Sequence, residues 1–107
     1  MASENTGGTQ TAVINTEHSL ATITSAGAFV LAVDLANLAN GDTVELVCKT
    51  KTRSGSTARQ VFRVSYSHAQ ADPNVQSIPI VSPHSVEFLL KQTAGTGRNF
   101  DWAVYAL

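Results

Sequence analysis

The chain has 107 residues, the size of one domain, and it is 43% hydrophobic, so it can bury one core without disulfides or a structural metal. Only 14% of the residues are charged and the formal net charge is −1, so overall charge gives no reason to expect a nucleic-acid partner. The single cysteine, Cys48, excludes an internal disulfide, and no apolar run approaches the roughly 18 residues of a membrane span, so we expect a soluble protein.

Residues 1–11 are polar and contain Gly7-Gly8. Such a segment lacks the side chains of a core element, so we expect a flexible N-terminal arm, with the β-sandwich domain spanning 12–107. The segment also lacks the basic region and the apolar region of a secretory signal. We therefore expect a protein made in the cytoplasm.

Beyond the arm, breaks rich in Gly, Ser, Asn, Asp and Pro separate short segments rich in Val, Thr, Phe and Tyr. Such segments at intervals of about ten residues are typical of a β-sandwich or barrel. The expected strands lie in eight segments: 11–17, 19–25, 28–35, 43–52, 59–69, 75–81, 85–93 and 99–107. The sequence thus predicts an all-β fold, a single-domain β-sandwich of about eight strands that is jelly-roll-like or immunoglobulin-like. The only helical candidate is 33–42, where Gly41 would end a single turn.

Apolar and polar residues alternate in several segments, as they do when one face of a strand is buried. In 43–49, Val44, Leu46 and Cys48 are expected to face the core. In 100–106 the same alternation puts Trp102 and Tyr105 on opposite faces, so one of them points away from the core. Because an uncovered apolar strand invites pairing, we expect this last segment to lie inside the sheet, or to be covered by a second subunit or by the N-terminal arm.

The segment 93–97 has the sequence TAGTG, which has two interpretations. A phosphate-binding loop would need GxxxxGK[ST] or GxGxxG before a helix, whereas a strand is predicted to follow here. The glycines instead suit a tight hairpin, because glycine adopts positive φ without strain. We therefore expect the two flanking strands to pair, with Phe88 beside Phe100 and Trp102.

Residue types that catalyse reactions or bind metals form no recognisable motif. His18, His68 and His84 lack the spacing of metal ligands, and Cys48 is expected to be buried and unreactive. The serine motifs GxSxG and SxxK do not occur, and no two acidic residues are placed as a catalytic pair. We expect no catalytic site, no metal site and no cofactor. A small hydrolase would require a histidine to meet a carboxylate or Cys48 in the folded chain.

Between Glu45 and Asp72 the sequence has no acidic residue but has five basic ones: Lys49, Lys51, Arg53, Arg59 and Arg63. The RSGS sequence at 53–56 is typical of a hairpin tip, so these side chains should gather on one hairpin. Such a hairpin can be solvated, where its charge discourages edge pairing, or it can bind an acidic protein surface. Nucleic acid is the least favoured partner, because no exposed aromatic side chains are interleaved with the basic ones.

Two stretches carry a resemblance to a known group of proteins. They are LANGDTVEL (38–46), which precedes the basic hairpin, and LLKQTAGTGRNFDW (89–102). Over about residues 30–107 the chain resembles small phage-encoded virion structural proteins. The resemblance implies a structural role, most often that of a capsid decoration or cement protein, which forms small oligomers over the gaps between major capsid subunits. It assigns a role to no individual residue.

The sequence and the resemblance together lead us to expect a non-enzymatic structural protein of a phage particle, made in the host cytoplasm and located in the virion. Its expected partners are the major capsid protein and other copies of itself, as a dimer or trimer, and include neither a membrane nor nucleic acid. The residues expected at protein interfaces are Lys49, Lys51, Arg53, Arg59, Arg63, Trp102, Tyr105 and Leu107.

A second hypothesis is a tail- or fibre-associated receptor-binding module that recognises carbohydrate. Whichever of Trp102 and Tyr105 is exposed would then stack on a sugar, with Asn or Asp side chains nearby as hydrogen-bond partners. Function has to be argued from a site, and the sequence alone shows none that decides between these hypotheses.

Overall fold

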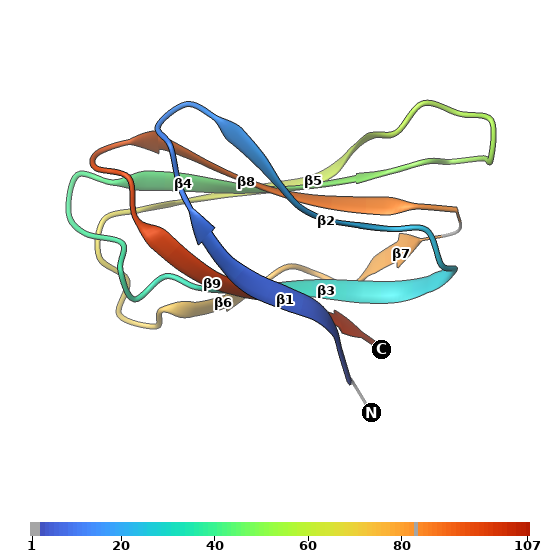
Figure 1. Cartoon of the computed structure of the whole chain (residues 1–107), viewed down its shortest axis with the longest axis horizontal. Coiled ribbons are helices and arrows are strands. Elements are labelled where there is room, and N and C mark those ends of the chain that lie inside the picture. Colours follow the sequence, from blue (N-terminus) through green and yellow to red (C-terminus); the bar gives the residue numbers. More distant parts are fainter. Residues whose placement is uncertain (1–2, 83) are drawn as a thin grey trace.

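The computed structural model describes residues 3–82 and 84–107 and consists of two antiparallel sheets packed face to face (Figure 1). The five-stranded sheet has the order β1-β9-β3-β6, with β7 also pairing with β3. The four-stranded sheet has the order β2-β8-β4-β5. The strands within the described residues are β1 (Ser3–Thr11), β2 (Glu17–Ile23), β3 (Gly27–Asp34), β4 (Thr43–Thr50), β5 (Arg59–Ser67), β6 (Asn74–Gln76), β7 (Ile80–Ser82), β8 (Val86–Ala94) and β9 (Asn99–Ala106).

The strands pair in a nested pattern around the β4–β5 hairpin. β4 pairs with β5, β3 with both β6 and β7, β2 with β8, and β1 with β9, all antiparallel. A long hairpin that folds over in this way gives a double-sheet jelly roll. The prediction of an all-β sandwich is confirmed. The sequence left a jelly-roll-like and an immunoglobulin-like sandwich open, and the observed strand order is that of the jelly roll.

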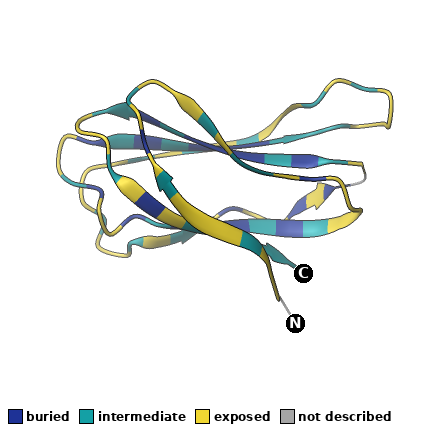
Figure 2. Ribbon diagram, viewed as in Figure 1, coloured by how far each residue is buried: buried dark blue, intermediate teal, exposed yellow. Residues whose placement is uncertain are grey.

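The N-terminal segment differs from the prediction, because residues 3–11 form a strand and not an arm outside the sandwich. β1 pairs with β9 from Ser3 opposite Ala106 to Thr11 opposite Asn99. Its side chains are polar because β1 lies at the edge of the sheet and is exposed along most of its length (Figure 2). The pairing satisfies backbone groups of β9, which therefore lies inside the sheet, as expected, covered by the chain's own N-terminal segment. Residues 1–2 of the predicted arm lie outside the described residues.

Two other segments depart from the predicted strands. Residues 12–16, within the first predicted strand, form the turn between β1 and β2, where Asn15 has φ 63°. The predicted strand 75–81 is divided into β6 and β7, since Ser77 turns inward and its hydroxyl accepts a hydrogen bond from the Leu31 backbone N–H at 3.0 Å. The helical candidate 33–42 instead comprises the last two residues of β3 and turns, which include a hydrogen bond from the Leu38 N–H to the Leu35 carbonyl at 2.9 Å.

The connection between β8 and β9 is not the expected hairpin. β8 belongs to the four-stranded sheet and β9 to the five-stranded sheet, so residues 95–98 cross from one sheet to the other. Phe88 and Phe100 are both fully buried and lie in opposite sheets. The aromatic faces therefore meet in the core between the sheets and not side by side on one sheet.

The predicted alternation defines the core. Val44, Leu46 and Cys48 of β4 are fully buried, and they face Leu31 and Val104 of the other sheet in one apolar cluster. The described residues contain no helix of the length and apolarity required to cross a membrane.

Candidate interaction surface

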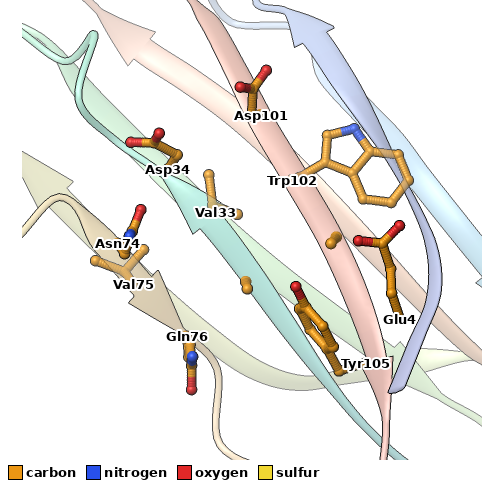
Figure 3. Close-up of a pocket in the computed structure, with 11 residues that line it drawn as sticks. Glu4, Val33, Asp34, Asn74, Val75, Gln76, Asp101, Trp102 and Tyr105 are labelled. Carbon is orange, nitrogen blue, oxygen red and sulfur yellow. The ribbon is translucent and has the colours of Figure 1, made fainter. Parts of the chain in front are cut away.

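The outer face of the five-stranded sheet carries a groove that runs across the strands. Its floor is a row of small residues, since Gly7 of β1, Ala103 of β9 and Ala32 of β3 lie opposite one another. On each side stands a row of larger outward side chains, two residues further along each strand. The groove has a volume of about 400 Å³, and Figure 3 shows the side chains that line it. The depression therefore follows directly from the size of the residues in three neighbouring rows.

One wall of the groove is acidic and is called the acidic row here. It consists of Thr9, Asp101, Asp34 and Asn74, which lie opposite one another on β1, β9, β3 and β6. The Thr9 hydroxyl donates to Asp101 Oδ1 at 2.6 Å, and the Ala36 N–H donates to Asp34 Oδ1 at 2.9 Å. The residues that line the groove include a further carboxylate, Glu4, and no lysine or arginine. Two like charges directly opposite each other on neighbouring strands destabilise a sheet, so this row favours a cationic partner.

The other wall of the groove continues into an apolar surface, which we call the apolar end. It consists of Val30, Ile78, Val81, Tyr105 and Leu107. Tyr105 lies opposite Val30, and the Leu107 N–H donates to the carbonyl of Ala28, which lies opposite Val81. A second depression of about 250 Å³ lies among Val30, Gln76, Tyr105 and Leu107. Ile78, Val81 and Leu107 are between 57% and 68% exposed, so three large apolar side chains stand in solvent at this end.

Two of the five basic residues predicted at an interface are neutralised within the chain. Lys49 Nζ lies 3.6 Å from Glu17 Oε1, and Arg63 Nε donates to Glu45 Oε2 at 2.8 Å. The sequence suggested an unbalanced basic stretch because no acid lies between residues 45 and 72. The fold brings Glu17 next to that stretch, since β2, β8 and β4 are neighbours in the four-stranded sheet.

The other three basic residues, Lys51, Arg53 and Arg59, form what is called the basic hairpin here. Lys51 and Arg53 lie in the loop between β4 and β5, and Arg59 is the first residue of β5. Within the described part of the chain, none of the three makes a salt bridge. Figure 1 shows this loop projecting at one end of the molecule's long axis. The predicted hairpin tip is confirmed, and its free positive charge is concentrated there.

The structure separates the two aromatic residues predicted at an interface. Tyr105 points outward into the groove, whereas Trp102 packs against the core, with its ring next to Gly8 of β1. A Cβ built at Gly8 would lie 3.7 Å from the indole ring, which is van der Waals contact, so the ring lies directly over this residue. Trp102 therefore belongs to the inner face, and Tyr105 is the aromatic residue of the outer surface.

A buried polar cluster around Asp42, between the end of β3 and the start of β4, was not identified from the sequence. Asp42 is only 2% exposed. Its Oδ2 accepts hydrogen bonds from the Ala39 N–H at 2.9 Å and from Arg98 Nε at 2.8 Å, and its Oδ1 accepts one from the Thr96 N–H at 3.1 Å. Burial by itself raises the pKa of Asp42, but the hydrogen bonds from Ala39, Arg98 and Thr96, together with the charge of Arg98, outweigh burial and lower the pKa below the usual value.

Gln92 extends this cluster into the crossover between the sheets. Its amide nitrogen donates to the carbonyls of Ala94 and Thr96 at 3.0 and 2.7 Å, and its amide oxygen accepts from the Arg98 N–H at 3.1 Å. Asp42 therefore joins the LANGD stretch to the QTAGTGR stretch, and Gln92 braces the QTAGTGR turn internally. The signal in the sequence was the pairing of an Asn-Gly-Asp turn with a second glycine-rich turn that carries an arginine.

Two of the three histidines and the cysteine have structural contacts in the part of the chain that the structure describes. His18 Nε2 accepts from the Val13 N–H, and His68 Nδ1 accepts from the Gly41 N–H, both at 3.0 Å. Cys48 is fully buried, and burial raises the pKa of its thiol to about 12. No cluster of three or more metal-ligating side chains occurs within the described residues. These groups brace turns or fill the core, so the surface of the five-stranded sheet is the better candidate for function.

Comparison with protein-family models, with curated proteins and with solved structures found no match to this chain.

Proposed function

We propose that this chain is a non-enzymatic structural protein of a phage particle, of the capsid decoration or cement type, which binds the major capsid protein and is located in the virion. The observation that carries the proposal is the apolar end of the five-stranded sheet. Of five large apolar side chains that are exposed in the described residues, Val81 and Leu107 lie there next to Ala28. Ile78 lies in the connection between Ser77, which hydrogen-bonds to Leu31, and Ile80, which is opposite Phe29. Apolar side chains that gather on a surface mark a site of protein interaction, whereas isolated ones are ordinary.

Two further arguments support this proposal. The jelly roll is a common architecture of viral capsid proteins, which is an analogy at the level of fold. The resemblance of residues 30–107 to small virion structural proteins suggests the same role.

A test uses empty shells assembled from the major capsid protein that the same genome encodes. The wild-type chain is expected to co-sediment with the shells, and a Val81→Asp, Leu107→Asp variant to bind at least about tenfold more weakly, as loss of interface anchors does. Val61→Asp is a matched control, because Val61 is 54% exposed but lies on β5 of the other sheet. Shells that bind no wild-type protein, or that bind all three chains equally, would contradict the proposal.

A second candidate is the receptor-binding module for carbohydrate, associated with a tail or fibre. The observation in its favour is that Tyr105 lines the same groove as Asp34, Asp101, Asn74 and Gln76 (Figure 3). An aromatic ring beside carboxylate and amide side chains is suited to stack on a sugar and to hydrogen-bond its hydroxyl groups. A glycan array on the wild-type chain and on Tyr105→Ala separates the two candidates, since only the second predicts a glycan signal that the substitution removes.

A further inference from the structure

The charged residues that remain after pairing within the chain are segregated by sign. Of the seven basic residues, Lys49, Arg63 and Arg98 form salt bridges, and Lys91 lies opposite both Glu17 and Glu45 in the sheet. The rest are the three residues of the basic hairpin: Lys51, Arg53 and Arg59. Among the acidic residues, Glu4, Asp34 and Asp101 line one groove that contains no basic side chain. Apart from Asp72 and Glu87, which do not line the groove, the remaining acidic side chains line the groove and the remaining basic side chains form the basic hairpin.

These two surfaces lie at opposite ends of the sandwich. The acidic row is formed where β3 ends, at Asp34. The basic hairpin begins after Thr50 and lies at the end where β3 begins. Thr50 is opposite Val86, and Val86 is also opposite Ile23, the last residue of β2 before β3. The molecule is 40 Å long, and Figure 1 shows the hairpin projecting at one end of this axis. The hairpin therefore does not reach the groove of its own chain, and its complement is available only on another molecule.

The groove suits the end of a hairpin in size. Its two walls are four residues apart on β9, from Asp101 to Tyr105, which corresponds to ~14 Å at about 3.4 Å per residue. The floor between the walls consists of backbone and small side chains, so Lys and Arg side chains that enter the groove from solvent can reach the carboxylates. Arginine forms paired hydrogen bonds with a carboxylate, and two facing aspartates offer four acceptor oxygens.

We propose that the basic hairpin of one copy docks into the acidic groove of a second copy, with Lys51, Arg53 and Arg59 against Glu4, Asp34 and Asp101. The contact relieves the repulsion between the two facing aspartates, which nothing in the described chain neutralises. Because it joins different surfaces of two copies, it closes as a reciprocal pair or a ring, or continues as a chain. The inference does not depend on capsid binding, which we place on the residues of the apolar end.

The test measures self-association of the full chain by sedimentation velocity and light scattering, at low and high salt. The wild type is expected to associate at low salt and to dissociate as salt screens the charges. A hairpin variant, Lys51→Glu with Arg53→Glu, and a groove variant, Asp34→Lys with Asp101→Lys, should each associate at least about tenfold more weakly, or ~1.4 kcal/mol. Asp72→Lys changes the charge of an exposed loop residue outside both surfaces and should associate like the wild type.

Mixing the two variants makes the test specific. The acidic hairpin of one variant then matches the basic groove of the other, so the mixture should associate although neither variant does so alone. The hairpin variant changes only loop positions, of which Lys51 is half-buried and Arg53 exposed, so it remains informative if the groove variant fails to fold.

Three results would overturn the proposal. The first is a wild type that stays monomeric at all concentrations and salt levels. The second is association that survives both charge reversals. The third is association that requires added Ca²⁺ and is lost in EDTA. The last result would place a cation, and not a second copy, in the groove. Failure of capsid binding with intact self-association would reject the proposed function and leave this inference standing.

Discussion

The chain places aspartates in two contrasting settings. Asp42 is buried, and its two carboxylate oxygens accept hydrogen bonds from two backbone N–H groups and from Arg98. Asp34 and Asp101 face each other on the outer surface of the five-stranded sheet, where each accepts one hydrogen bond and neither has a cation. The same side chain thus serves two purposes, since Asp42 stabilises the fold and the exposed pair is available to a partner.

The difference follows from the cost of burying charge. A buried carboxylate without partners destabilises a protein by several kcal/mol, so Asp42 is tolerated only because its partners are complete. An exposed pair costs only about 0.2–1 kcal/mol, which a stable sheet can sustain. A protein can therefore retain unfavourable charge on a surface that another molecule will neutralise.

Replacing Asp42 by Asn should give the largest loss of stability. The amide removes the charge next to Arg98 and puts an N–H₂ group where one oxygen now accepts hydrogen bonds, so we expect a loss of about 3 kcal/mol in the free energy of unfolding. Chemical denaturation monitored by Trp102 fluorescence measures this change. A loss below about 0.5 kcal/mol, which is typical of surface substitutions, would show that the buried cluster does not hold the two turns together.

Replacing Gly95 by Ala should have the next largest effect, through the same cluster. Gly95 has φ 89°, and a Cβ there would collide with the Asp42 carboxylate and lie 2.8 Å from Asp42 Cα. We expect a loss of about 2–3 kcal/mol, from the left-handed backbone and from the displaced carboxylate. Gly55→Ala is the matched control, because a Cβ at Gly55 meets nothing within 4 Å. Equal denaturation midpoints for the two variants would contradict this account of the crossover.

Much of the fold could be predicted because it depends on local alternation. The inward faces of β4, β8 and β9 follow from a period of two in apolar residues, and the β4–β5 tip follows from RSGS. β1 was missed because an edge strand exposed on most of its length is polar, and its pairing with β9 depends on residues about 90 positions away. The sequence predicts a hairpin after β8 because a glycine with positive φ suits both kinds of connection, and the contact of this turn with the distant Asp42 is not visible in the local sequence.

The candidate surface could be predicted only in part, because it too depends on contacts between residues that are far apart in the sequence. Tyr105, Leu107 and the free charges of the basic hairpin are visible in the sequence. The groove is not, because its floor and walls come from residues on β1, β3 and β9 that only the register brings into rows. The neutralisation of Lys49 by Glu17 also depends on strand order, so a count of charges along the chain overestimates the basic surface.

Acidification should affect stability through Asp42. Its pKa is lower in the folded state than in the unfolded chain, so the unfolded state takes up a proton first as the pH falls. The contribution of the ionised carboxylate is complete above the unfolded pKa of about 4, and it is lost as the pH falls through the folded pKa. Denaturation midpoints measured from pH 7 to pH 3 should decrease more steeply in the wild type than in Asp42→Asn. Parallel curves would assign the acid sensitivity to other carboxylates.

Replacing Asp101 by Asn should have the smallest effect, and its sign should be opposite to that of Asp42→Asn. The amide oxygen can still accept the hydrogen bond from Thr9, while the repulsion from Asp34 disappears, so we expect a gain of about 0.2–0.5 kcal/mol at low salt. The gain should vanish at high salt, because the repulsion between exposed charges is screened. Denaturation at two salt concentrations measures it. A loss of stability that does not depend on salt would mean that Asp101 serves the fold in the way Asp42 does, and the reason for expecting a cationic partner in the groove would then disappear.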